Sequence, residues 1–245
     1  MTTFFSSDFH FGHQNIISYC RRPYHSLAEM NNTLVANWNA LVGPHDVVHV
    51  LGDVAMGRRD ETLRFVSQLA GRKVLYPGNH DRCWYGHGPS AADFEKEYLD
   101  AGFDEIRQGP YKLRVAGRLV TLCHLPYRGD SGDTDRFSKF RPVDEGLWLL
   151  HGHVHDKWRQ HGRMINVGVD VWDFAPVSED AVAALMDAEA NAADRAGVST
   201  GAGPVTISRG IGTSTRRSAR RSAAGTKRQG ATWFRFARTT RSQSG

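Results

Sequence analysis

The sequence predicts an α/β or α+β fold in which sheets and helices form a layered sandwich. Short apolar runs alternate with stretches of helical spacing through the first half of the chain. The second half holds mainly strand candidates and one final helix. This order, βαβαβ followed by a strand-rich region, argues against a single doubly wound parallel sheet. An apolar content of 40% is enough to form a core.

The first half contains three predicted strands and three predicted helices. Apolar runs that end in turn residues predict strands at 2–7, 46–51 and 73–76. The clearest helix covers 27–42, because its apolar residues fall on one stripe: Leu27, Met30, Leu34, Trp38 and Leu41. Two shorter helices are expected at 60–69 and at about 91–99, the second with Ser90 as its N-cap.

The second half begins with a predicted hairpin. Strands at 111–115 and 119–123 flank Ala116-Gly117-Arg118. Further strands are expected at 147–150 and 164–167. Ser178 is a candidate N-cap for a last helix that ends near residue 190.

The charge distribution divides the chain into a body and a tail. Residues 191–245 hold eleven Lys and Arg and one acid, net +10, so 1–190 carry −5 of the overall +5. The tail is rich in Gly, Ser, Thr and Arg and lacks apolar periodicity, which predicts disorder. Its positive charge suits a polyanion or nucleic acid, but an extension without a function is the alternative. The predicted folded domain is therefore 1–190.

Composition also bears on the compartment. No apolar run approaches the roughly 20 residues that cross a bilayer, and the N-terminal segment lacks the pattern of a signal peptide. The three cysteines are too widely spaced for a disulfide framework or a Cys-x-x-Cys site. We expect a cytoplasmic protein without membrane contact, and the sequence leaves a homo-oligomer open.

Polar clusters follow five of the predicted strands. They are Asp8-Phe9-His10, Gly52-Asp53, Gly78-Asn79-His80-Asp81, His124, and His151-Gly152-His153-Val154-His155. Because open sheets bind ligands at the carboxyl ends of their strands, these clusters are expected to surround one site.

The residue types in these clusters suit a pair of divalent cations. Carboxylate, imidazole and amide groups favour Mn²⁺, Fe²⁺, Zn²⁺ or Ni²⁺. Asp8 and His10 point to the same side if the backbone stays extended, and His153 and His155 repeat that spacing. The two carboxylate oxygens of Asp53 allow it to bridge two cations about 3.5–4 Å apart.

Together the five blocks resemble the calcineurin-like metallophosphoesterase superfamily, and in particular its small bacterial and phage members. The resemblance spans residues 8–155 and implies a four-layer α/β/β/α sandwich. It implies a first metal site of Asp8, His10, Asp53 and His155. The second site would consist of Asp53, Asn79, His124 and His153. Two divalent cations are implied, with Mn²⁺ first and Fe, Zn or Ni as alternatives.

The resemblance also implies a reaction, in which a metal-bridging hydroxide attacks a phosphomonoester or phosphodiester. Nucleotide-like small esters are the expected substrates. His80 would be the general acid, with Asp81 as its orienting partner, and His13 and Arg128 are candidate substrate-binding residues.

One motif departs from the family's pattern, and some interpretations have alternatives. The second Asp of the Gly-Asp-x-x-Asp-Arg-Gly pattern is absent after Asp53, which argues against a Ser/Thr protein phosphatase. Arg21 and Arg22 are interpreted as a solvated pair. Two other functions stay open: a non-catalytic scaffold of the same fold, and a nucleic-acid-directed esterase guided by the tail.

Overall fold

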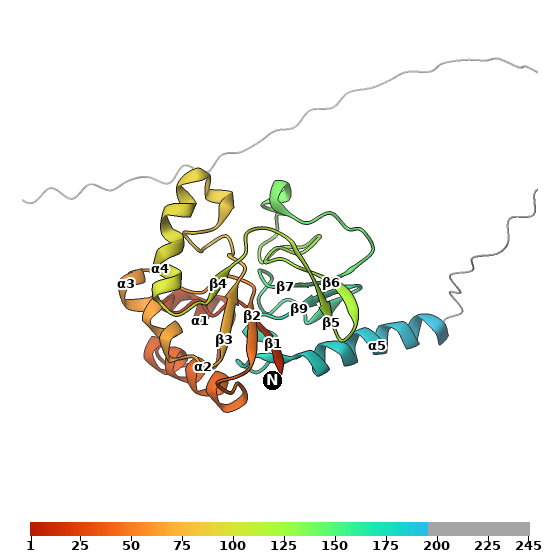
Figure 1. Cartoon of the computed structure of the whole chain (residues 1–245), viewed down its shortest axis with the longest axis horizontal. Helices are drawn as coiled ribbons and strands as arrows, with labels where there is room; N and C mark the ends of the chain where they lie inside the picture. The colour runs from red at the N-terminus through yellow and green to blue at the C-terminus, as the bar shows by residue number, and fades with distance from the viewer. Residues whose placement is uncertain (196–245) are drawn as a thin grey trace, which may run out of the picture. The chain divides into compact units, whose positions relative to one another are not determined.

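The computed structural model describes residues 1–195, and the predicted disorder of the tail beyond them lies outside the described residues. The described chain forms a mixed α/β fold with two five-stranded sheets (Figure 1). Both sheets are mixed, because each combines parallel with antiparallel pairs. The predicted α/β class is confirmed.

The first sheet has the order β10-β1-β2-β3-β4, with β10 as its antiparallel edge strand. Its strands are β1 (Thr3–Ser6), β2 (Val47–Val50), β3 (Arg72–Leu75), β4 (Glu105–Ile106) and β10 (Val177–Ser178). From β1 to β4 all pairs are parallel, as the alternation of strands and helices predicts. The carboxyl ends of β1, β2 and β3 therefore meet at one edge.

The second sheet has the order β5-β6-β7-β9-β8. Its strands are β5 (Tyr111–Val115), β6 (Arg118–Leu122), β7 (Trp148–His151), β8 (Gln160–His161) and β9 (Met164–Asn166). The predicted hairpin is present, but its turn has two residues rather than three. Ala116 and Gly117 both adopt positive φ, +46° and +78°, which matches the twist of the flanking strands and leaves Arg118 in β6.

Five α-helices and five 3₁₀ segments complete the described chain. The α-helices are α1 (Gln14–Tyr19), α2 (Leu27–Leu41), α3 (Arg59–Thr62), α4 (Glu95–Asp100) and α5 (Glu179–Arg195). The 3₁₀ segments are η1 (Leu63–Gln68), η2 (Tyr85–His87), η3 (Pro89–Phe94), η4 (Ser138–Phe140) and η5 (Val169–Val171). Ser178 does cap α5, because its hydroxyl accepts a hydrogen bond from the Ala181 N–H at 3.3 Å.

Three helix predictions differ from the structure in detail. The helix expected at 60–69 begins as one α-helical turn and continues as the 3₁₀ segment η1. Ser90 is not an N-cap, because η3 already begins at Pro89, which fits a first helical position. The last helix continues to Arg195, five residues beyond the predicted domain boundary at 190. No signal in the sequence led us to expect α1.

Two hydrophobic clusters lie on either side of the first sheet. Phe4, Val48 and Val50 pack with α2 residues such as Leu34 and Trp38. Phe5, Val74 and Tyr76 point to the other side and pack with residues of the second sheet and of α5: Val115, Val120, Leu122, Leu150, Ile165, Val182 and Met186. The two sheets therefore face each other across a shared core.

The remaining face of the second sheet packs mainly against loop residues. Leu149 and Met164 contact a cluster that includes Trp84, Phe137 and Trp158. The described residues thus give two mixed sheets with helices on the first, and the implied four-layer α/β/β/α sandwich is not confirmed. No helix among residues 1–195 is both long and apolar enough to span a bilayer.

Candidate metal centre

The polar clusters predicted from the sequence meet at the strand ends. Asp8 and His10 follow β1, Asp53 follows β2, Asn79 follows β3 and His124 follows β6. His153 and His155 follow β7. Except for His155, which is half-buried, all of these side chains are buried at the junction of the two sheets. The structure therefore brings the seven predicted ligands into one region.

Asp53 lies at the centre of this region. Its Oδ2 is 3.6 Å from His10 Nε2 and 3.4 Å from His124 Nε2. Burial would raise the pKa of Asp53, but His124, His80 and His10 hold it well below the usual range. A carboxylate that contacts an imidazole on each side has the geometry of a bridging ligand.

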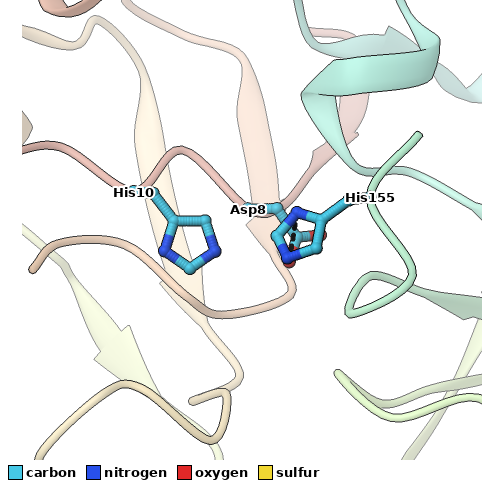
Figure 2. Close-up of side chains that lie close together, drawn as sticks. All are labelled: Asp8, His10 and His155. Carbon is cyan, nitrogen blue, oxygen red and sulfur yellow. Dashed lines mark ion pairs between the residues drawn. The ribbon is translucent and has the colours of Figure 1, made fainter. Parts of the chain in front are cut away.

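Asp8, His10 and His155 form one group of potential ligands (Figure 2). Their ligand atoms lie within 4.8 Å of one another, and His155 Nδ1 is 4.0 Å from Asp8 Oδ1. The rings of His10 and His155 are 5.0 Å apart between centroids. This group contains three of the four residues predicted for the first site, Asp53 being the fourth.

A second group consists of His124, Asn79 and His153. His124 Nδ1 donates to the Leu51 carbonyl at 2.7 Å, so Nε2 points toward Asn79 Oδ1 at 3.1 Å. Burial would lower the pKa of His124, but Asp53 and then Asp8 outweigh burial and raise it to about 9. Because the oxygens of Asp53 and Asn79 face Nε2, a cation bound there would take the place of a proton on this nitrogen.

The ligand residues are held in an uncommon backbone conformation. Asp8, His10, Asp53, His153 and His155 all have positive φ, between +51° and +72°. They make up half of the ten non-glycine residues with positive φ in the described chain. Such strain gathers at functional sites. The extended backbone on which the same-side orientation of Asp8 and His10 depended is absent, because β1 ends at Ser6 and both residues have positive φ.

Two glycines allow the loops after β2 and β3 to approach each other. A Cβ on Gly52, whose φ is +85°, would lie 2.3 Å from Gly78 N. A Cβ on Gly78 would lie 2.3 Å from Asp53 Oδ1. Both positions therefore require glycine so that Asp53 can reach the centre of the site.

Both ring nitrogens of His10 are buried without a hydrogen-bond partner among the described residues. Nε2 of His153 and Nδ1 of His155 lie 3.2 and 3.5 Å from carboxylate oxygens of Asp130 and Asp170. Burial lowers the pKa of His10 well below its ordinary value and that of His153 to about 3, so both imidazoles are neutral. Neutral imidazole is the form that binds a metal, and a bound cation would satisfy these nitrogens. The residues present therefore fit a pair of divalent cations.

The proposed general acid lies at the mouth of this site. His80 is exposed, and its ring centroid is 5.4 Å from that of His10. Its backbone N–H donates to Asp53 Oδ1 at 2.9 Å, which orients the bridging carboxylate. His10, His13 and His80 line an open cavity of about 490 Å³. This position suits contact with a substrate.

Two predicted roles change in the structure. The Asp81 carboxylate accepts hydrogen bonds from the backbone N–H groups of Gly78, Asp53 and Val54, so it braces the loops rather than orienting the His80 ring. Arg128 is exposed and lines another cavity, together with residues such as Asp144 and Arg163. Its proximity in sequence to His124 therefore did not predict its position.

Sequence reasoning missed a buried ion pair behind the first site. The side chains of Arg22 and Asp170 are 0% and 2% exposed, and they form two hydrogen bonds of 2.8 and 2.9 Å. Arg22 also donates to the carbonyls of Asp8 and Phe9, and Asp170 Oδ2 is 3.5 Å from His155 Nδ1. The expectation of a solvated Arg21 and Arg22 pair holds for Arg21 alone. No local pattern marks Arg22, because its partner is 148 residues away.

Known proteins similar to this chain share most of its described length. The Gene 66 protein of Mycobacterium phage L5 is 33% identical over 201 residues, which cover 76% of this chain and 94% of the phage protein. The uncharacterized protein MJ1445 of Methanocaldococcus jannaschii is 33% identical over 190 residues, 74% of this chain and 89% of the relative. No family model matches the chain.

Solved structures include one with a clear likeness. The protein of unknown function AQ665 from Aquifex aeolicus has 29% identity and a TM-score of 0.59, over 75% of this chain and 98% of that protein. An archaeal phosphodiesterase has 14% identity and a TM-score of 0.35, over 69% of this chain and 82% of that enzyme, which is too distant to indicate an activity. On its identity and coverage, the chain belongs to the family of the mycobacteriophage Gene 66 protein.

Proposed function

We propose that this protein is a metal-dependent phosphoesterase. The observation that carries the proposal is the position of Asp53 Oδ2 between the Nε2 atoms of His10 and His124, at 3.6 and 3.4 Å. A carboxylate in this position would reduce the repulsion between two cations held close together. The two ring nitrogens of His10, which are buried without a hydrogen-bond partner within residues 1–195, also support a cation at this position.

The two proposed sites divide the ligands between them. Asp8, His10 and His155 would hold one cation, and Asn79, His124 and His153 the other, with Asp53 shared. When bound, the cations would supply a nucleophile derived from water and neutralise charge on the phosphate. Nitrogen and oxygen ligands without cysteine suit Mn²⁺, and Fe, Zn and Ni remain alternatives.

Residues at the cavity mouth would act on the substrate directly. His80 is exposed there and would give its proton to the leaving oxygen of the ester. His13 lines the same cavity, with its ring 5.4 Å from that of His10, and would contact the phosphate or its leaving group. A cavity of about 490 Å³ favours small phosphomonoesters or phosphodiesters, of which nucleotides are the first class to test.

Hydrolysis of two generic aryl esters tests this function. The Mn²⁺-supplemented protein should hydrolyse p-nitrophenyl phosphate or its bis-aryl diester. His80→Ala and Asp53→Asn should each lose most of the turnover, whereas His25→Ala, which changes an exposed histidine outside the site, should not. Undiminished turnover in both site variants would refute the assignment.

Metal binding measured by titration calorimetry separates catalysis from a scaffold role. Asp53→Asn should bind less Mn²⁺ than the wild-type protein, and His80→Ala should bind as much. A wild-type protein that binds two cations but hydrolyses no ester across a broad panel would favour the non-catalytic scaffold.

A further inference from the structure

The loop between β6 and β7 places a further carboxylate, that of Asp130, beside the candidate metal ligands. Asp130 Oδ2 lies 3.2 Å from His153 Nε2, and the Asp130 side chain is only 2% exposed. No motif in the sequence pointed to this residue. Its burial indicates a built position rather than a chance surface contact.

Asp130 is held in place by two arginines of its own loop. It accepts hydrogen bonds from Arg136 through the backbone N–H at 2.9 Å, Nε at 3.1 Å and Nη2 at 2.6 Å. Arg141 Nη2 adds a longer contact of 3.4 Å and also donates to the Arg136 carbonyl at 2.9 Å. The guanidinium of Arg136 is therefore fixed relative to Asp130 and, through it, to His153.

Arg136 nevertheless remains open to solvent. Its side chain is 47% exposed, and it lines the same 490 Å³ cavity as His10, His13 and His80. The guanidinium carbon lies 5.5 Å from the centre of the Phe137 ring, which itself packs 5.7 Å from the ring of His153. The positively charged Arg136 side chain is thus anchored by Asp130 and exposed to the cavity in which the proposed reaction would occur.

We propose that Arg136 binds the phosphate group of the substrate and that Asp130 is its positioning residue. The assignment rests on the proposed phosphoesterase function and names the side chain that recognises the anion. A guanidinium donates charge-assisted hydrogen bonds to phosphate oxygens, and anchoring it in advance reduces the entropy lost on binding. The bonds to Asp130 and Ser131 use Nε and Nη2, which leaves the Nη1 amino group to donate to an anion.

The same loop offers a matched control. Arg128 is also exposed, but it lines the cavity that contains Asp144 and Arg163. Arg128→Ala removes the same charge eight residues away without touching the metal cavity. If the positive charge acts only through its long-range field, both variants should lose the same affinity for phosphate. If Arg136 contacts the phosphate, only Arg136→Ala should lose affinity.

The affinity of the Mn²⁺-loaded protein for inorganic phosphate, measured by titration calorimetry, tests the proposal without requiring turnover. Arg136→Ala should weaken phosphate binding roughly tenfold or more, because a hydrogen bond to a charged group is lost. Arg136→Lys should recover part of the affinity, because lysine restores the positive charge but not the planar guanidinium. Arg128→Ala should bind as the wild type does.

The kinetic readout tests the two roles separately. Arg136→Ala should raise KM for an aryl phosphate by a similar factor, and Asp130→Asn should do so while leaving bound Mn²⁺ unchanged. A wild-type affinity for phosphate in Arg136→Ala, or none in the wild type, would overturn the assignment of Arg136. If no ester is hydrolysed but phosphate binding still depends on Arg136, the anion site stands and the phosphoesterase function fails.

Discussion

The carboxylate of Asp81 lies 2.8 Å from the backbone nitrogen of Asp53 and accepts its hydrogen bond. The same carboxylate accepts from Gly78 N at 2.8 Å and from Val54 N at 3.0 Å. One buried side chain therefore ties the loop after β2 to the loop after β3. The position of Asp53 depends on this tie, although Asp81 does not line the 490 Å³ cavity that contains His80.

Replacement of Asp81 by alanine should destabilise the protein and weaken metal binding. Three buried N–H groups would lose their acceptor, at about 1–3 kcal/mol each, so the free energy of unfolding should fall by about 3 kcal/mol or more. Urea unfolding of the metal-free protein measures this loss. Asp100→Ala is the control, because Asp100 forms an exposed i,i+4 pair with Lys96 that contributes about 0.5 kcal/mol. Equal midpoints for the two variants would contradict the bracing role.

The second prediction concerns Arg22 and its neighbour Arg21. Arg22→Ala should lower the free energy of unfolding by about 3–5 kcal/mol, because Asp170 would stay buried without its partner. Arg21→Ala should change it by less than about 1 kcal/mol, since Arg21 is 87% exposed and its pair with Asp156 is screened. Thermal or urea unfolding of both variants gives the comparison. Similar losses at the two positions would mean that the buried pair does not stabilise the fold.

The gathering of the candidate metal ligands was predictable from the sequence because each of them follows a strand. The strands themselves carry an unbroken apolar signal, as in 46–51, and their parallel order brings Asp8, Asp53 and Asn79 to one edge. The backbone around these residues was not predictable. Left-handed φ at Asp8 or His153 reflects the tertiary structure, and the propensity of an aspartate or histidine alone favours other conformations.

The residues that support the ligands were harder to foresee. Arg22 and Asp170 lie 148 positions apart, and Asp130 contacts His153 only because a loop folds back over the second sheet. Each looks like an ordinary surface charge in the sequence. Burial decides their role, and burial depends on the complete fold.

The third prediction concerns metal addition. A cation that binds the folded state alone should raise the free energy of unfolding by about 2.7 kcal/mol at a hundredfold excess over its Kd. Mn²⁺ should therefore raise the unfolding temperature of the wild-type protein, and chelation should reverse the change. Asp8→Asn should show a much smaller rise, whereas Asp93→Asn, which alters an exposed acid outside the site, should match the wild type. An equal rise in Asp8→Asn would exclude Asp8 as a ligand.

The final prediction uses His49, which lies in β2 away from the metal ligands. Its ring stacks on Phe5 at 5.5 Å, and Nδ1 lies 3.1 Å from the Tyr76 hydroxyl. Burial, with a smaller effect from Arg107, lowers the pKa of His49 to about 4. In the unfolded chain the pKa is about 6.5, so between these values the unfolded state binds the extra proton. The contribution of His49 to stability should therefore be complete above about pH 6.5 and fall as the pH drops toward 4, by about 3 kcal/mol.

His49→Phe should remove this pH dependence while keeping an aromatic ring against Phe5. The measurement is urea unfolding of the metal-free wild type and variant at several values between pH 4 and pH 7. The contribution of the other histidines cancels in the difference between the two free energies of unfolding. His45→Phe, at an exposed position four residues earlier, should keep the wild-type slope. If the wild type and His49→Phe lose the same stability as the pH falls, burial does not hold His49 neutral in the folded protein.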